Sequence, residues 1–377
     1  MRKICKLLHL WLGLASGIVV FIVCITGCLY VFKDELIAAT EPWRKVEARN
    51  TPFKTPSQIL HVSNQVAADS TPSAITYGER TDAVWVDYFR QEKGQTTVFL
   101  DPYSAQVLHV SQKEKGEFEF FRWVLQGHRT LWLPREVGHW IVGYGVLVFF
   151  ITLITGCVLW LPRRWNKKSV RHMLTLKRPF SLLKFNFDLH TVVAFYALLP
   201  LMTLCFTGLM FSLDWWSGGV YRLVSGGQAP IPYEMPLSDS LEHAPILKNP
   251  LDRLYKKISE EEKKAVQFYY ALPQTKDGIY RVSVVHERGS YYKTDNLFFD
   301  QYTLHPLQGK GAYAGRYAQA SAADKLMRMN LEIHDGRVLG VMGKILMCLA
   351  SLVGASLPVT GFIIWYRRIQ RSKRNKS

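Results

Sequence analysis

Four long apolar stretches divide the chain, at 7–32, 139–161, 187–213 and 338–366. Each reaches or exceeds the ~20 residues that a helix needs to cross ~30 Å of hydrocarbon. Lipid offers no partner for free backbone groups, so helix is the expected conformation in each stretch. We expect Pro200 and Pro358 to kink the third and fourth helices. The sequence therefore predicts a membrane protein with four transmembrane helices.

The net charge of +17 has its source in three clusters beside these stretches. The clusters contain no Asp or Glu, and the other 30 basic residues balance the 30 acidic ones. The positive-inside rule places such clusters in the cytoplasm, so both termini are expected there. No basic surface remains that would indicate a nucleic-acid partner. The clustered residues are Arg2, Lys3, Lys6, Arg163, Arg164, Lys167, Lys168, Arg171, Lys177, Arg178, Lys184, Arg367, Arg368, Arg371, Lys373, Arg374 and Lys376.

A basic start before an apolar stretch is also typical of a signal peptide. Ile25-Thr26-Gly27-Cys28 even resembles a lipoprotein cleavage box. The same four letters recur at 154–157 inside the second apolar stretch, where no signal peptidase acts. The first stretch also continues past Cys28, so we expect it to remain as a transmembrane helix.

Two longer sections between the helices are expected outside the membrane. Each reads as a short helix followed by a hairpin: 55–68 with 83–90 and 96–100 in one, and 250–257 with 279–287 and 294–299 in the other. Neither section contains Cys, so no disulfide framework is expected. We predict two small α+β periplasmic domains. The full division is helix 1 at 1–32, domain 1 at 33–138, helix 2 at 139–162, a basic cytoplasmic loop at 163–186, helix 3 at 187–213, domain 2 at 214–333, helix 4 at 334–366 and a basic cytoplasmic tail at 367–377.

Histidines and Thr-Gly pairs recur at matching distances and indicate an internal duplication. His9 and His190 each precede a Thr-Gly pair by 17 residues. His128 and His334 precede the other two pairs by 27 and 26 residues. Both copies start on the same side, which predicts parallel repeats about an axis along the membrane normal. We expect the Thr-Gly pairs to allow close helix packing.

Such an axis would let equivalent histidines face each other at equal depth. This pairs His9 with His190 near the cytoplasmic face and His128 with His334 near the outer face. Two opposed imidazoles in apolar surroundings suit six-coordinate haem iron. The alternative is that each histidine simply lies among lipid headgroups. His139 has no counterpart and is read as an interfacial residue or a neighbour of the outer site.

Three basic residues are candidate partners for haem propionates. Lys344 lies about ten residues beyond His334, where a charge inside the membrane needs a partner or a watery path. Its alternative is snorkelling to the outer face. Arg129 and Arg337 closely follow the two outer histidines and could also meet propionates.

The four histidine motifs carry a resemblance to a known family. They are Leu8-His9-Leu-Trp-Leu-Gly-Leu, His128-Arg-Thr-Leu-Trp-Leu leading to Gly138-His-Trp-Ile-Val-Gly, Asp188-Leu-His190 and Ile333-His334-Asp-Gly-Arg. Over nearly the whole chain the sequence resembles the bacterial PepSY-associated transmembrane family, which includes siderophore reductases linked to iron uptake. The resemblance implies two b-type haems held by the same two histidine pairs. Leu10, where a basic residue is usual, and His139, where Arg or Lys is usual, depart from the pattern.

Together with the resemblance to this bacterial family, these features predict a di-haem oxidoreductase of the bacterial inner membrane. The resemblance implies that it reduces a periplasmic ferric siderophore or other ferric chelate. The cytoplasmic sections are too short for a flavin or nicotinamide domain, so the donor is expected to be a membrane quinol or a separate reductase. One alternative is a non-redox PepSY-domain membrane protein that binds periplasmic partners. Another is an accessory to the transport of iron complexes, although broken helices with polar groups at the midplane are the usual mark of a transporter.

Overall fold

The computed structural model describes residues 2–68, 70–90, 94–162, 165–176, 181–238 and 247–374, without the side chains of Arg90 and His172. Five residues of the basic clusters lie outside these ranges: Arg163, Arg164, Lys177, Arg178 and Lys376. The chain forms two compact units. The helical unit comprises 1–34, 118–219 and 330–377, and the sheet unit comprises 35–117 and 220–329.

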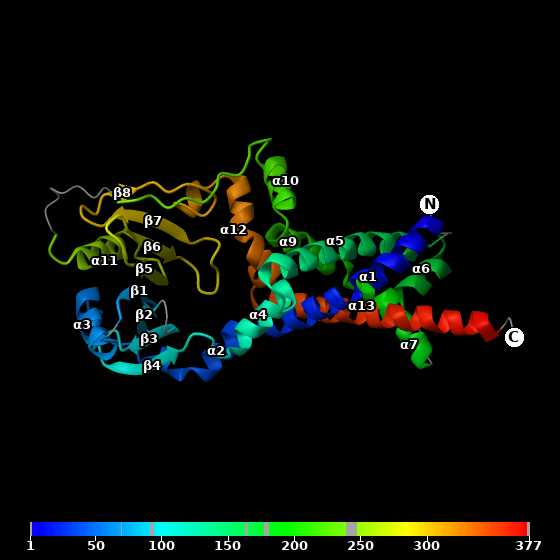
Figure 1. Ribbon diagram of the computed structural model, residues 1–377, viewed down its shortest axis with the longest axis horizontal. Coiled ribbons are helices and arrows are strands. Elements are labelled where there is room, and N and C mark those ends of the chain that lie inside the picture. Colours follow the sequence, from blue (N-terminus) through cyan, green and yellow to red (C-terminus); the bar gives the residue numbers. More distant parts are fainter. Residues whose placement is uncertain are drawn as a thin grey trace. The chain divides into compact units, whose positions relative to one another are not determined.

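Long apolar helices build the helical unit. α1 packs against α5 and α13, and α9 packs against the same two helices. Helices α1, α5 and α13 run side by side, so that α1 begins and α13 ends at the same end of the unit (Figure 1). The elements that lie wholly or partly in this unit are α1 (Arg2–Tyr30), α2 (Lys33–Thr40), α4 (Phe120–Thr130), α5 (Arg135–Trp160), α6 (Lys167–Leu174), α7 (Leu182–Asp188), a π-helical turn (Leu189–Val193), α8 (Ala194–Tyr196), α9 (Leu198–Ser212), α10 (Asp214–Val224), α12 (Ala322–His334), a 3-10 turn (Arg337–Leu339) and α13 (Gly340–Arg374).

Within the described residues, three helical stretches are long and apolar enough to cross a membrane. They are Arg2–Thr40, Arg135–Trp160 and Arg337–Arg374. The bent pair Leu182–Tyr196 and Leu198–Ser212 makes a fourth if it is one span. The chain is thus a multi-pass membrane protein.

The third stretch is bent, which confirms the kink expected at Pro200, and it consists of two helices, Leu182–Tyr196 and Leu198–Ser212, where one kinked helix was expected at 187–213. Its two parts meet at 68°. Pro200 explains the break, because it has no N–H to offer the carbonyl of Tyr196 and its ring crowds that carbonyl. Pro358 lies inside α13, which stays helical from Gly340 to Arg374.

Among the residues that the structure describes, the sheet unit is built on one antiparallel sheet of eight strands, in the order β4-β3-β2-β1-β5-β6-β7-β8. Its elements, apart from the ends of α2, α10 and α12, are a 3-10 turn (Pro42–Arg44), α3 (Pro56–Val66), β1 (Pro72–Tyr77), β2 (Val84–Arg90), β3 (Gly94–Leu100), β4 (Val107–Lys113), α11 (Pro250–Glu261), β5 (Gln267–Ala271), β6 (Ile279–Val285), β7 (Asp295–Asp300), β8 (Pro306–Leu307) and a 3-10 turn (Tyr317–Gln319).

The two sections expected as separate domains share this sheet. Strand β1 of the first pairs with β5 of the second, with Ile75 opposite Tyr270 and Thr76 opposite Tyr269. An unpaired edge strand leaves a row of backbone groups without partners, and the β1–β5 pairing removes one such edge from each section. The expectation of two domains is therefore corrected to one unit with two similar halves.

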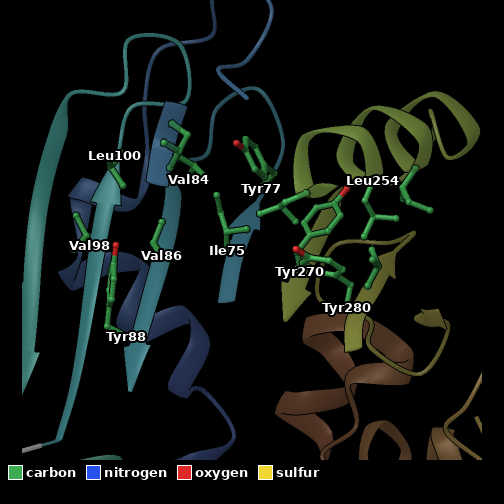
Figure 2. Packing of buried hydrophobic residues seen from close by; sticks show 14 of the residues in the cluster. Ile75, Tyr77, Val84, Val86, Tyr88, Val98, Leu100, Leu254, Tyr270 and Tyr280 are labelled. Carbon is green, nitrogen blue, oxygen red and sulfur yellow. The ribbon is translucent and has the colours of Figure 1, made fainter. Parts of the chain in front are cut away.

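Alternation along the strands directs apolar side chains into a single core. In β2, Val84, Val86 and Tyr88 are buried while the residues between them turn to the other face. Figure 2 shows these side chains together with Tyr270 of β5 and Leu254 of α11. Helices α3 and α11 contribute to the same core, since Ile59 and Ile258 are both 0% exposed. The core therefore joins the two halves as well as filling each one.

Candidate functional site: two opposed histidine pairs

The helical unit brings His9 and His190 together. His9 projects from α1, and His190 lies in the π-helical turn that follows α7. Their ring centroids are 6.1 Å apart, with 78° between the ring planes. The two residues are equivalent in the repeat read from the sequence.

A second pair of the same form consists of His128 and His334. His128 lies in the last turn of α4, and His334 ends α12. Their ring centroids are 6.2 Å apart, with 67° between the ring planes. Both histidines belong to short helices that precede the long helices α5 and α13. The structure therefore unites the histidines in the two pairs predicted from their spacing.

Each imidazole is anchored at Nδ1 to one of the four Thr-Gly pairs. His9 Nδ1 lies 3.2 Å from Thr155 Oγ1 and 3.1 Å from the Thr152 carbonyl. His128 Nδ1 lies 3.4 Å from Thr26 Oγ1 and 2.9 Å from the Val23 carbonyl.

The other two histidines have the same kind of anchor. His190 Nδ1 lies 2.9 Å from Thr360 Oγ1, and His334 Nδ1 lies 2.8 Å from Thr207 Oγ1. In all four cases the threonine stands beside a glycine, on a helix other than the one that carries the histidine.

These contacts fix which nitrogen carries the proton in the neutral ring. A carbonyl can only accept, so Nδ1 of His9 and of His128 donates. The hydroxyls of Thr360 and Thr207 donate to helix carbonyls, at 2.8 Å to Ser356 and 2.6 Å to Thr203. Each hydroxyl therefore accepts from its histidine. In each ring Nδ1 holds the proton, which leaves the Nε2 lone pair available to a metal.

The glycine of each Thr-Gly pair faces the same ring. A Cβ built on Gly156 would lie 2.9 Å from Cε1 of His9, and one on Gly361 would lie 3.0 Å from Cε1 of His190. The corresponding distances are 3.1 Å from Gly27 to His128 and 3.5 Å from Gly208 to His334. Three of the four glycines therefore leave room that an alanine methyl would take from the imidazole.

The basic candidates have distinct surroundings. Lys344 is only 5% exposed on α13 and interacts electrostatically with Asp335. Arg337 pairs with Asp335 at 2.9 Å and with Asp34 at 3.5 Å. Arg129 is exposed on α4. His139 belongs to neither pair, and its ring lies 5.6 Å from that of Trp140.

The threonines of the Thr-Gly pairs are the contacts that sequence reasoning missed. They were expected to serve helix packing, whereas each one touches a paired histidine. The available signal was their fourfold recurrence beside glycine, at nearly the same distance from a histidine in each repeat. A residue needed only for helix packing has no reason to recur at a constant spacing from a histidine.

Comparison with known proteins identifies the family of the chain. The sequence profile of the family described as PepSY-associated TM region matches residues 7–368, a range that holds both histidine pairs and all four Thr-Gly pairs. Comparison with curated proteins gives no match. The match covers nearly the whole chain, and the chain therefore belongs to the family of PepSY-associated transmembrane regions.

Proposed function

We propose that this chain is a membrane oxidoreductase that carries two b-type haems. His9 and His190 would supply the axial ligands of one haem iron, and His128 and His334 those of the other. The observation that carries the proposal is the two pairs of imidazoles, with ring centroids 6.1 Å apart in one pair and 6.2 Å apart in the other, and with Nε2 of each ring free of the proton.

The ring separation fits one iron between two imidazoles. Metal–nitrogen bonds are about 2 Å long, and a ring nitrogen lies about 1 Å from its centroid, so two axial imidazoles have centroids about 6 Å apart. Within the described residues, no group of three or more His, Cys, Asp or Glu could hold a metal by itself. A histidine pair therefore supplies two ligands, which suits an iron whose other four come from a porphyrin.

The chain's own contribution would be ligation, burial and nearby charge. A bound haem supplies one-electron transfer, and the protein tunes its potential through the ligands and their surroundings. Lys344, Arg129 and Arg337 are the residues that we propose for the propionates. Of these, Lys344 is the most deeply buried, at 5% exposed.

The two sites would give electrons a route across the membrane. The 17 residues from His9 to Thr26, the contact of His128, correspond to roughly 25 Å of helix at ~1.5 Å per residue. The basic clusters favour a bacterial inner membrane with both termini in the cytoplasm, His9 near that face and the sheet unit in the periplasm. The internal duplication predicted from the sequence is supported by the repeated contacts of the two halves.

The proposed reaction is reduction of a periplasmic ferric siderophore or another ferric chelate. A membrane quinol or a separate reductase would supply one electron for each Fe(III) that becomes Fe(II). Hard oxygen ligands hold the larger and less charged Fe(II) less tightly, so reduction would release the iron.

Absorption spectra of the detergent-purified protein, oxidised and then reduced, test the proposal. We expect two haems per chain, about half of the haem after His9→Ala or His334→Ala, and little after both together. His139→Ala is the matched control, because His139 lies outside both pairs, and it should keep both haems. Full haem content after all four paired histidines are replaced would contradict the proposal. It would favour the alternative of a non-redox protein that binds periplasmic partners or assists transport.

The acceptor needs a separate measurement. Protein reduced with dithionite should be reoxidised by a ferric siderophore, with the Fe(II) trapped by a chelating dye. His334→Ala should abolish this delivery, whereas His9→Ala should leave the outer haem reactive. If the reduced protein stays reduced with every ferric chelate tried, quinone or another small acceptor becomes the next candidate.

A further inference from the structure

The geometry points to a second role for the Thr-Gly pairs, which rests on the proposed haem sites: we propose that each pair positions one axial histidine and tunes the iron that the histidine binds. The pairs are Thr26-Gly27, Thr155-Gly156, Thr207-Gly208 and Thr360-Gly361. Threonine would act through the hydrogen bond at Nδ1, and glycine through the space that it leaves beside Cε1.

The contacts follow one rule throughout the helical unit. His9 of α1 lies against the pair in α5, and His128, just before α5, lies against the pair in α1. His190, just before α9, lies against the pair in α13, and His334, just before α13, lies against the pair in α9. Each half of the chain thus orients its own two histidines, whereas each histidine pair takes one ring from each half.

Each threonine hydroxyl accepts a hydrogen bond from the ring because it donates its own proton to a backbone carbonyl of its helix. Besides the two bonds given above, Thr155 Oγ1 donates to the Thr152 carbonyl at 2.9 Å and Thr26 Oγ1 to the Ile22 carbonyl at 2.6 Å. An acceptor at Nδ1–H makes the imidazole a more basic ligand and fixes its orientation. A more basic ligand favours Fe(III), so removing the hydroxyl should raise the reduction potential of that haem.

At the site shared by His128 and His334, threonine and glycine do not contact the two rings equally closely. Thr207 Oγ1 is 2.8 Å from His334, but Thr26 Oγ1 is 3.4 Å from His128, whose closer partner is the Val23 carbonyl at 2.9 Å. The order is reversed for the glycines, since a Cβ on Gly27 would be 3.1 Å from His128 and one on Gly208 3.5 Å from His334, an ordinary contact.

This reversal makes a crossed test possible with two valine and two alanine variants. Thr207→Val should raise the potential of the outer haem and weaken haem retention by about 10–100-fold, the usual effect of losing such an outer contact. Thr26→Val should do much less. Gly27→Ala should displace the ring and lose the outer haem, while Gly208→Ala should keep it. Thr207→Ser, which restores the hydroxyl, should return the potential to that of the wild type.

Redox titration, haem content and the low-temperature spectrum of each haem are the readouts. The inner haem on His9 and His190 serves as the internal control for folding in every variant. Equal effects of Thr207→Val and Thr26→Val, or of Gly27→Ala and Gly208→Ala, would overturn the positioning role, as would wild-type potentials in Thr207→Val. Absence of haem from the wild-type protein would instead overturn the proposed function.

Discussion

At the scale of single residues, Asp82 connects the two halves of the sheet unit. Its carboxylate accepts hydrogen bonds from Lys45 of the first half and Arg288 of the second, the latter at 3.0 Å. Burial raises the pKa of Asp82, but the hydrogen bonds and charges of Lys45 and Arg288 outweigh it and hold the pKa below its usual value. Arg288 also donates a hydrogen bond to Glu79 at 2.6 Å, so one arginine of the second half pairs with two carboxylates of the first half.

We expect Asp82→Asn to lower the free energy of unfolding by about 1 kcal/mol, because Lys45 and Arg288 are about half exposed and solvent screens the interaction. The folded-state pKa lies below the unfolded one, so the stabilisation is complete above about pH 4 and is lost as the pH falls through the folded-state value. Thermal unfolding of the full chain in detergent between about pH 3 and about pH 7 measures this, because the range extends below and above the unfolded-state pKa of about 4.

Glu234→Gln is the matched control for Asp82→Asn. Glu234 pairs with Lys310 at 2.9 Å, but the two side chains are 56% and 67% exposed. Such a pair contributes little, so this variant should stay within about 0.5 kcal/mol of the wild type at every pH. A larger loss in Glu234→Gln than in Asp82→Asn would contradict the role given to Asp82.

At the scale of elements, the pairing of β1 with β5 holds the sheet together. Thr76 is 0% exposed and lies between Trp85 of β2 and Tyr269 of β5. A proline there removes an N–H from a central strand, and central strands exclude proline. We expect Thr76→Pro to cost about 3 kcal/mol or more and to expose the sheet unit to protease.

Leu108→Pro provides the comparison, since β4 is an edge strand and its register shifts beside Leu108. Edge strands and bulges tolerate proline, so this variant should remain close to the wild type in thermal unfolding and in limited proteolysis. Equal resistance of Thr76→Pro would mean that the two halves of the sheet fold independently of the β1–β5 pairing.

Local sequence patterns predicted the hairpins of the sheet but not the pairing of its two central strands. Alternation at 83–90 and 279–287 predicted the hairpins, because a strand turns alternate side chains toward the core and toward the other face of the sheet. The pairing of Ile75 with Tyr270 joins residues far apart in the chain, and no local pattern specifies it. For the same reason the sequence predicted two domains where the structure has one sheet.

At the scale of the whole molecule, the histidine pairs could be predicted because a repeat relates distant residues. Spacing alone matched His9 with His190 and His128 with His334. Spacing could not tell what the Thr-Gly pairs touch, because that depends on which helices become neighbours. The bend in the third stretch shows a similar limit: Pro200 indicated where the helix would bend, but the sequence did not give the 68° angle.

The last prediction concerns the orientation of the chain in the membrane. A fluorescent reporter fused after Ser377 should mature in the cytoplasm, because the tail carries one of the basic clusters. A phosphatase inserted at Gly227 should be active outside, in the periplasm. Gly227 has a φ of 103° and nothing within 4 Å of a Cβ placed on it, so an insertion there disturbs no packed side chain.

Gly116 provides an independent position in the other half of the sheet unit. It has a φ of 90° and equally open surroundings, and a phosphatase there should report the same side as one at Gly227. Because two of the predicted membrane helices lie between the glycines, agreement between them requires an even number of crossings between Gly116 and Gly227. A tail reporter that fails to mature, together with phosphatase inactivity at both glycines, would reverse the orientation. It would also place the His9 pair at the outer face, where the proposed delivery to a ferric chelate would begin from the wrong site.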